Sequence, residues 1–269
     1  MQHKVLSIAG VDPSGGAGVL ADVKSFSALG CYGMAVITAI TAQNTKGVSA
    51  VFDIGVDAVR QQLESVLADI TPDAIKLGML FHEDIILAVA DILKKNILPK
   101  KIPIVLDPVM MAKSGDALLQ PAGMVALKEK LIPLADIITP NLREAESLGG
   151  YSRLSEDMMP ECGVSLLSLG CGAVLLKGGH LEDKHANDYY IGQDAPEGVW
   201  LEAEKINTKN THGTGCTLSS AIASYLAKGL SMVEACRFGK DYLLGSIKAV
   251  EKKSLGGGAG PVHHFYKIW

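Results

Sequence analysis

Six short apolar runs, separated by longer segments of helical character, constrain this chain more than any other feature of its sequence. A run that is apolar throughout is typical of a strand buried on both faces of a parallel sheet. The intervening segments, such as residues 57–70 and 122–132, have the length and periodicity of helices that connect parallel strands. The sequence therefore predicts an α/β fold with a mainly parallel central sheet. The expected strands are residues 5–10, 34–41, 74–80, 103–109, 136–141 and 172–179.

The last third of the chain adds a hairpin and two long helices to this pattern. Residues 188–192 and 198–206 flank a turn-forming segment, and residues 214–228 and 232–252 have helical periodicity. With 269 residues, 48% of them hydrophobic, the chain can bury a full core without disulfides or metals. No stretch rich in Pro, Gly or Ser divides it. We therefore expect one domain spanning residues 1–269.

Charge and cysteine content exclude several kinds of partner and site. The formal net charge is −4 at pH 7, so the chain lacks the basic excess by which proteins bind nucleic acids or anionic membranes. The five cysteines are widely spaced and form neither a CxxC pair nor a zinc-binding pattern, which indicates a reducing compartment. Polar residues and glycine interrupt the apolar N-terminal stretch too early for a signal peptide or a membrane span. The expectation is a soluble cytoplasmic protein.

Polar residues and glycines collect where the predicted strands end. Ligands bind beyond the carboxyl ends of the strands in open α/β sheets, so these residue types indicate a binding site there. Carboxylates, amides, a lysine and flexible backbone are all expected at one edge of the sheet. They are Gly10, Asp12, Gly15, Gly16 and Gly18 after the first run, Gln43 and Asn44 after the second, Asp107 after the fourth, Asn141 and Glu144 after the fifth, and Lys177, Gly178 and Gly179 after the sixth.

The segment NTHGTGCTLSSAIASYLAKG, residues 210–229, contains a glycine-rich turn that leads directly into a helix of small residues. Unpaired N–H groups and the positive end of the helix dipole form an anion hole suited to a phosphoryl group. The N–H groups belong to Gly213, Thr214, Gly215 and Cys216. In the alternative interpretation the glycines only make a tight loop, and Thr214 or a neighbour caps the helix. The sequence contains no GxxxxGK[ST] phosphate loop and no dinucleotide fingerprint.

Eight ordered motifs run through the chain and are more specific together than any one alone. They are AGVDPSGGAGVLADVKSFSALG (9–30), TAQNT (41–45), KLGML (76–80), VLDPVM (105–110), TPNLREAE (139–146), LLKGGH (175–180), NTHGTGCTLSSAIA (210–223) and GPVHHF (260–265). They closely resemble the ribokinase-like superfamily and, within it, the hydroxymethylpyrimidine/phosphomethylpyrimidine kinases of thiamine biosynthesis. The resemblance implies a three-layer α/β/α fold and a homodimeric kinase that uses ATP and Mg2+. The implied reactions convert 4-amino-5-hydroxymethyl-2-methylpyrimidine to its monophosphate and then to the diphosphate.

The resemblance implies an acceptor pocket formed by Gly10, Ala17, Asp22, Gln43, Met79 and Val109. Independently of it, the Gln43 amide offers one acceptor and two donors, which can pair with the exocyclic amine and adjacent ring nitrogen of an aminopyrimidine. From the residues alone, the simpler interpretations are preferred: Gln43 as a loop-capping amide and Met79 as a core filler. A flap over this pocket is expected near residues 110–118, whose glycine and polar residues suit a loop that excludes water.

The resemblance also implies that Asp107, Asn141 and Glu144 orient magnesium and that Lys177 lies near the nucleotide phosphates. Mg2+ keeps several waters and uses few protein carboxylates beside substrate phosphates, which fits this set. Each residue also has a simpler interpretation. Asp107 before a proline suits a turn, Glu144 suits the first turn of a helix, and Lys177 suits a snorkelling surface position.

Cys216 stands where sugar kinases of the superfamily usually carry an aspartate base, and cysteine is expected there in the pyrimidine kinases. A helix N-terminus lowers the pKa of a thiol, so Cys216 is a candidate to accept the proton of the acceptor hydroxyl. We expect it to matter chiefly for the first phosphorylation, because a phosphate acceptor is already largely ionised at neutral pH. His212 is a candidate phosphate contact, with a structural loop histidine as the alternative.

Two other functions compete with this interpretation. The first is a pyridoxal kinase of the same superfamily, whose acceptor is also a flat heteroaromatic hydroxymethyl compound; Gln43 and Met79 favour the pyrimidine. The second is a noncatalytic pyrimidine-binding or regulatory protein. The presence of Asp107, Glu144 and Lys177 favours a kinase, because binding alone does not require a set of groups for phosphoryl transfer.

Overall fold

The computed structural model describes residues 3–111, 115, 118–179, 185–250 and 255–269. The strands in this part of the chain are β1 (Lys4–Val11), β2 (Tyr32–Asn44), β3 (Gly47–Asp53), β4 (Ala74–Leu77), β5 (Ile104–Leu106), β6 (Ile137–Ile138), β7 (Ala173–Lys177), β8 (Asp188–Gly192) and β9 (Ala195–Leu201). They form one sheet in the order β3-β2-β1-β4-β5-β6-β7-β8-β9. The pairs from β2 through β1 to β7 are parallel, and β3, β8 and β9 pair antiparallel at the two edges. The predicted mainly parallel sheet and the hairpin near its end are confirmed.

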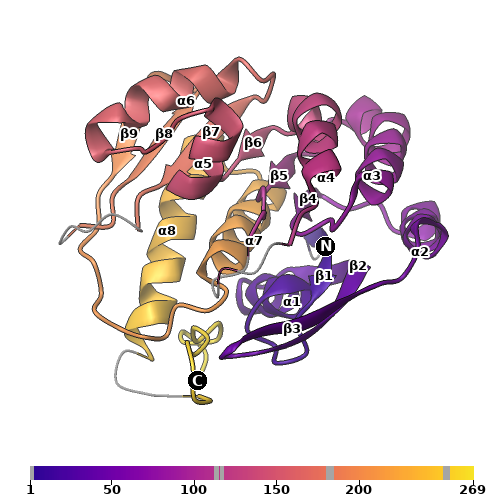
Figure 1. Cartoon of the computed structure of the whole chain (residues 1–269), viewed down its shortest axis with the longest axis horizontal. Coiled ribbons are helices and arrows are strands. Elements are labelled where there is room, and N and C mark those ends of the chain that lie inside the picture. Colours follow the sequence, from indigo (N-terminus) through magenta and orange to yellow (C-terminus); the bar gives the residue numbers. More distant parts are fainter. Residues whose placement is uncertain (1–2, 112–114, 116–117, 180–184, 251–254) are drawn as a thin grey trace.

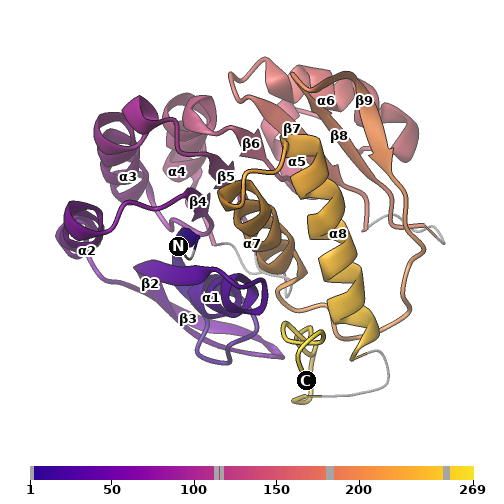
Figure 2. The ribbon, with the colours of Figure 1, turned by 180° about the vertical axis from the view of Figure 1, so that it is seen from behind.

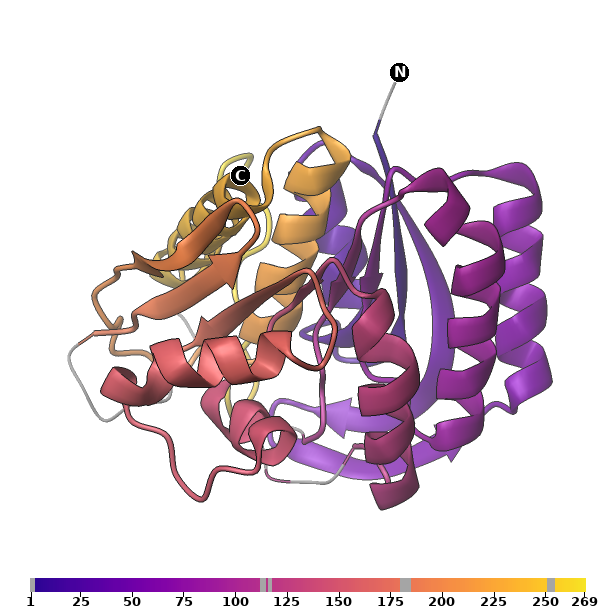
Figure 3. The same cartoon turned by 90° about the horizontal axis from the view of Figure 1, so that it is seen from above.

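Helices cover both faces of the sheet and give the predicted three layers (Figures 1 and 3). They are α1 (Gly18–Ala28), α2 (Val56–Asp69), α3 (Glu83–Asn96), α4 (Pro121–Ala126), α5 (Leu142–Gly149), α6 (Met159–Leu167), α7 (Thr214–Ala227) and α8 (Met232–Lys248). One apolar core joins the sheet to α2 through α6, and a second joins it to α1, α7 and α8. Figure 2 shows α7 and α8 side by side on their face. Strands β4 and β5 are buried along their whole length, as their apolar runs predict.

The boundaries of the elements differ from the prediction in two informative ways. The predicted strands 74–80 and 103–109 end at Leu77 and Leu106, because the residues that follow turn into the loops at the carboxyl edge. Strand β2 runs on to Asn44, beyond the predicted end at residue 41, because it pairs there with β3. Strand β3 itself was not predicted, since its residues are half-buried or exposed and form no continuous apolar run.

The C-terminal tail packs against two loops at the carboxyl edge of the sheet. The Ala259 N–H donates to the Thr45 carbonyl at 2.8 Å, which holds the tail to the β2–β3 turn. The His212 N–H donates to the Gly260 carbonyl at 3.0 Å, which holds it to the loop before α7. The glycine-rich segment near the end of the chain therefore closes one side of the region where the predicted site residues lie.

Candidate active site

A cavity of about 870 Å³ lies at the carboxyl ends of the central strands and extends to the start of α7 and one side of α8. Every predicted site residue except Asp22 lines it. The structure therefore brings together residues from most of the length of the chain, and their individual roles remain predictions. The lining residues among them are Gly10, Ala17, Gln43, Met79, Asp107, Val109, Asn141, Glu144, Lys177, His212, Gly213, Thr214, Gly215 and Cys216.

Asp22 lies behind the wall of this cavity and is fully buried. Its carboxylate accepts hydrogen bonds from the Ser7 hydroxyl at 2.6 Å and the Ser220 hydroxyl at 2.7 Å. It also forms an ion pair with Lys76 at 2.8 Å. Lys76 does line the cavity, so Asp22 neutralises and holds a charged residue of the cavity wall. The structure makes Asp22 a buried counter-ion and not a wall of the acceptor pocket.

The start of helix α7 has the features of the predicted anion hole. Gly213 is the N-cap, with φ +74°, and no side chain caps the helix. The Thr214 hydroxyl donates to the Thr211 carbonyl instead, so the alternative in which it caps the helix is wrong. A Cβ on Gly213 would collide with the Gly16 carbonyl, which explains the glycine. The first N–H groups of a helix have no acceptor within it and no side chain caps α7, so the N–H groups of Thr214 and Gly215 are available to an anion.

Lys177, Asp107 and Glu144 form one charged cluster beside this helix start. The Lys177 Nζ lies 2.8 Å from Asp107 Oδ1 and 3.9 Å from Glu144 Oε2. The lysine side chain is only 13% exposed, so the interpretation as a snorkelling surface lysine is wrong. Burial raises the pKa of Glu144 to about 7, even though the Lys177 charge opposes this rise. A Cβ on Gly215 would lie 3.3 Å from Asp107 Oδ2, which places the cluster directly against the anion hole.

Asn141 and Glu144 cap helix α5 reciprocally. The Asn141 side chain accepts from the Glu144 N–H at 3.0 Å, and the Glu144 carboxylate accepts from the Asn141 N–H at 2.8 Å. This capping box orients Glu144 toward Lys177. Among the described residues, no group of three or more His, Cys, Asp or Glu side chains could hold a metal by itself. Asp107 and Glu144 supply the carboxylate oxygens that Mg2+ prefers, and a Mg2+ ion bound there would take its remaining ligands from phosphates and water.

The Cys216 thiol is less acidic than its place in the helix predicts. Burial raises its pKa to about 11, and the Asp22 and Asp107 charges add to the rise. The Lys76 charge and a hydrogen bond from the Gly18 N–H act in the opposite direction but do not prevail. The expectation of a lowered pKa at the start of α7 is therefore wrong, because burial is the dominant influence on this thiol. At neutral pH Cys216 is a thiol.

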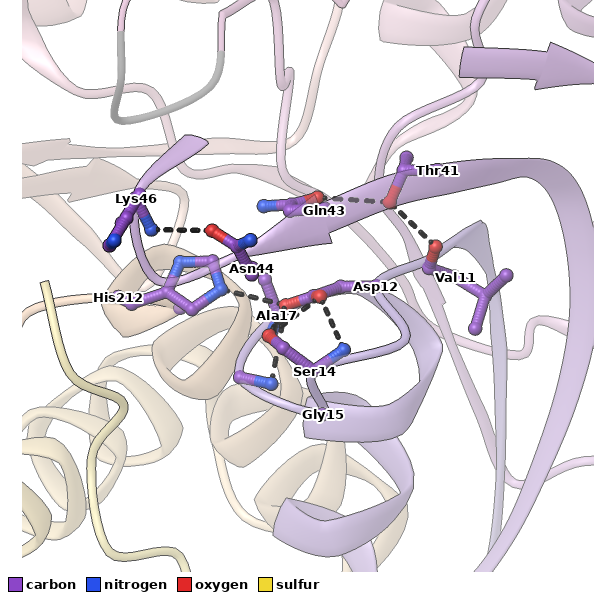
Figure 4. Close-up of polar contacts among 12 residues, drawn as sticks. Val11, Asp12, Ser14, Gly15, Ala17, Thr41, Gln43, Asn44, Lys46 and His212 are labelled. Atoms are coloured by element: carbon purple, nitrogen blue, oxygen red, sulfur yellow. Dashed lines mark hydrogen bonds and ion pairs between the residues drawn. The ribbon is translucent and has the colours of Figure 1, made fainter. Parts of the chain in front are cut away.

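The acceptor end of the cavity lies beside β2 and the loop after β1 (Figure 4). The Gln43 Oε1 accepts from the Thr41 hydroxyl at 3.1 Å, which orients the amide. Met79 packs in a small apolar cluster with Ala39, Leu118 and Val109, so it is both a core residue and a cavity wall. A Cβ on Gly10 would lie 3.2 Å from the Met79 sulfur, so glycine there leaves space for this side chain. Of the expected flap, residues 112–114, 116 and 117 lie outside the described part of the chain.

Sequence reasoning gave no role to several residues that line the cavity. Lys76 is one, although a lysine inside an apolar run is a recognisable signal of a paired, buried charge. Asp188 and Lys240 form a second buried ion pair, with 2.7 Å between their charged atoms. The far end of the cavity is apolar on one side, where α8 contributes Leu243 and Ile247.

No helix in the described part of the chain is long and apolar enough to cross a membrane.

Sequence comparison identifies relatives along almost the whole chain. The family model for phosphomethylpyrimidine kinase matches residues 12–263. The hydroxymethylpyrimidine/phosphomethylpyrimidine kinase of Rhizobium meliloti (strain 1021) is 48% identical over 265 residues, which are 98% of this chain and 97% of that protein. The protein of the same name from Escherichia coli (strain K12) is 46% identical over 98% of both chains.

Solved structures give the same result at the level of the fold. A crystal structure of phosphomethylpyrimidine kinase from Clostridium difficile 630 has 46% sequence identity and a TM-score of 0.79, covering 91% of this chain and 100% of that one. The pyridoxal kinase of Staphylococcus aureus in complex with AMP-PCP and pyridoxal has 34% identity and a TM-score of 0.89, covering 100% and 95%. This chain is thus a kinase of ribokinase-like fold and belongs to the phosphomethylpyrimidine kinase family.

Proposed function

We propose that this protein transfers the γ-phosphoryl group of ATP first to 4-amino-5-hydroxymethyl-2-methylpyrimidine and then to the resulting monophosphate. The names of its relatives support the substrate. The observation that carries the proposal is the single cavity in which an acceptor end, formed around Gln43 and Met79, meets the uncapped start of α7. Both reactions need this combination of a site for a flat polar ring and an adjacent anion hole.

At the acceptor end, Gln43 would recognise the aminopyrimidine. Its side chain has donors and an acceptor to match the exocyclic amine and the adjacent ring nitrogen, and Thr41 holds its orientation. Met79 and Val109 provide the apolar surface for the ring. At the opposite end, Leu243 and Ile247 of α8 provide an apolar wall suited to the base of ATP.

Between the two ends, the protein stabilises charge on the transferred phosphoryl group. The N–H groups of Thr214 and Gly215 point from the positive end of α7, and Lys177 lies beside them. Asp107 and Glu144 would hold Mg2+, with Asn141 orienting Glu144; when bound, this ion neutralises the nucleotide phosphates. Phosphoryl transfer passes through a loose transition state, so such positioning and charge stabilisation supply most of the catalysis.

Cys216 would serve the alcohol acceptor. The hydroxymethyl group must lose a proton as its oxygen bonds to phosphorus, and Cys216 lines the cavity at the start of α7. The phosphate acceptor has no such proton to lose at neutral pH. The proton would pass to the thiolate form of Cys216; burial raises the pKa of this thiol, so the thiolate is the minor form at neutral pH.

A pyridoxal kinase is the second candidate, because the Staphylococcus aureus pyridoxal kinase superimposes with a TM-score of 0.89. Steady-state kcat/KM values for the pyrimidine alcohol and for pyridoxal distinguish the two. We predict that Gln43→Ala lowers kcat/KM for the pyrimidine by about tenfold or more, since a buried hydrogen-bonding pair is lost. Asn44→Ala is the matched control, because the Asn44 side chain is engaged with the Lys46 N–H at 2.8 Å. A preference of the wild-type enzyme for pyridoxal would reject the pyrimidine assignment.

A further inference from the structure

The Asp12 carboxylate lies beside the cavity, is only 2% exposed and has no part in the reaction described above. It accepts hydrogen bonds from the Ser14 N–H at 2.8 Å and the Ala17 N–H at 2.9 Å, both in the loop that follows β1. Across 200 residues of sequence, it also accepts from His212 Nε2 at 2.7 Å (Figure 4). One carboxylate thus connects the loop after β1 with the loop before α7.

These two loops are packed so closely that only glycine fits between them. A Cβ on Gly16 would collide with the His212 ring, and a Cβ on Gly213 would collide with the Gly16 carbonyl. The first loop carries Ala17 of the acceptor end, and the second leads directly into the anion hole. The contact between Asp12 and His212 is therefore one of several that hold these two loops together.

The second nitrogen of the His212 ring is free to contact a ligand. No residue in the described ranges bonds to Nδ1, and every buried side-chain nitrogen or oxygen of these residues has a partner. Nδ1 is therefore accessible, and His212 lines both the main cavity and a smaller pocket beside the β2–β3 turn, each of which Gln43 also lines. In the proposed function, the phosphate of a monophosphate acceptor would lie between the pyrimidine ring and the anion hole. An imidazole can donate from both ring nitrogens at once only in its doubly protonated form, so simultaneous donation to a carboxylate and a phosphate would use that form.

We propose that Asp12 is a positioning residue for the second phosphorylation, which holds the His212 ring so that Nδ1 donates to the phosphate of the monophosphate acceptor. The inference rests on the proposed function, since it assumes that acceptor. Burial raises the pKa of Asp12, but hydrogen bonds from His212 and Ser14 outweigh this and lower it to about 2. Asp12 is therefore ionised at neutral pH and is a strong acceptor for the ring. The alcohol acceptor carries no phosphate, so its binding does not use this contact.

The test compares Asp12→Asn with wild type for both acceptors. We expect KM for the monophosphate to rise about tenfold and KM for the alcohol to change less than about twofold, since one charge-assisted hydrogen bond is lost. Calorimetric titration of the monophosphate without ATP should show the same loss of affinity. His212→Gln should give the same split, and the double variant should be no worse than His212→Gln alone. Ser14→Ala, which removes a hydroxyl partner of Asp12 and leaves the His212 contact, is the matched control and should resemble wild type.

Equal rises in KM for both acceptors, or additive losses of monophosphate affinity in the double variant, would overturn the inference. Asp12 would then only hold the two loops together. Thermal melting identifies variants that do not fold. If Asp12→Asn is among them, His212→Gln carries the test, because it keeps the backbone hydrogen bonds of Asp12. Failure of the proposed function is distinguishable, because it appears in the wild-type enzyme as no turnover of either pyrimidine.

Discussion

At the scale of single residues, Cys216 gives the sharpest prediction. Its sulfur lines the cavity, and in the proposed function the first acceptor must lose a proton whereas the second need not. We expect Cys216→Ala to lower kcat for the alcohol about 100-fold, the low end of the contribution of a general base, because only the thiolate, the minor form of Cys216, accepts the proton. The rate for the monophosphate should fall no more than about threefold. Single-turnover measurements with each acceptor check this, and an equal loss in both would contradict the division of roles.

Individual residues also show what the sequence could and could not predict. Fourteen of the fifteen predicted site residues line one cavity, because strand ends and a glycine-rich helix start have recognisable patterns; Asp22 does not, and the roles of all of them remain predictions. The ion pair between Asp22 and Lys76 was not predicted, because the two residues are 54 positions apart and nothing in the sequence shows that they meet in the fold. The pKa of Cys216 was predicted in the wrong direction, because burial is a property of the packed molecule.

At the scale of elements, the start of α7 is defined by two glycines with different constraints. Gly213 has φ +74° and lies against the Gly16 carbonyl, so both the backbone and the available space exclude a side chain. Gly215 has no such backbone constraint, but a Cβ there would lie 3.4 Å from Lys177 Nζ and narrow the space beside the anion hole.

The two glycines should therefore respond differently to alanine. We predict that Gly213→Ala lowers the free energy of unfolding by about 2 kcal/mol or more. Gly215→Ala should melt within a few degrees of wild type and lose about 100-fold in kcat, as when one donor to a developing anion is obstructed. Thermal melting and steady-state kinetics of both variants test this. Full activity of a folded Gly215→Ala enzyme would show that the start of α7 does not bind the phosphoryl group.

Strands whose side chains are buried could be predicted from the sequence, whereas a strand with exposed side chains could not. The buried strands β1, β4, β5 and β7 were found because their residues are mostly apolar and buried on both faces. Strand β3 was missed because its side chains remain partly in solvent and its pairing with β2 is a long-range contact. The same pairing extends β2 to Gln43 and Asn44, so the element that sequence analysis missed is one that positions the acceptor end.

At the scale of the whole molecule, the C-terminal tail makes stability depend on pH through His264. This side chain is 5% exposed and bonds to the Thr217 hydroxyl at 3.2 Å through Nε2. Burial lowers its pKa from 6.5 to about 4, and the nearby charges of Lys24 and His263 act in the same direction. Between these two pH values the unfolded chain binds more protons than the folded chain. Stability is therefore fully present above pH 6.5 and falls as the pH is lowered to about 4.

We predict that His264 accounts for about 3 kcal/mol of this loss in the free energy of unfolding. His264→Asn removes the titrating group and keeps a polar partner for Thr217, so it should flatten the pH dependence in this range. His3→Asn, at an exposed position that does not shift the pKa of His264, is the control and should keep the wild-type slope. Denaturant unfolding at pH 4.5 and pH 7 measures the difference, and an unchanged slope in His264→Asn would show that another group is responsible.

The expectations of one domain and of a homodimer remain predictions. All nine described strands belong to one sheet, and the site draws on both of its apolar cores. The active cavity includes residues from Ala9 to Ile247, so the function depends on nearly the entire chain. The pattern of strand ends located this site from the sequence, and the tertiary contacts of Asp12, Lys76 and His264 had to come from the structure.

The central claim is that one cavity performs two successive phosphorylations of a pyrimidine. Its most direct test is a time course of the purified enzyme with ATP, Mg2+ and either hydroxymethylpyrimidine or pyridoxal, with products identified by mass spectrometry. The account predicts that pyrimidine monophosphate accumulates first and is then converted to the diphosphate, with little phosphorylation of pyridoxal. Efficient phosphorylation of pyridoxal alone would identify the enzyme as a pyridoxal kinase. The absence of product from both acceptors would contradict the proposed kinase activity altogether.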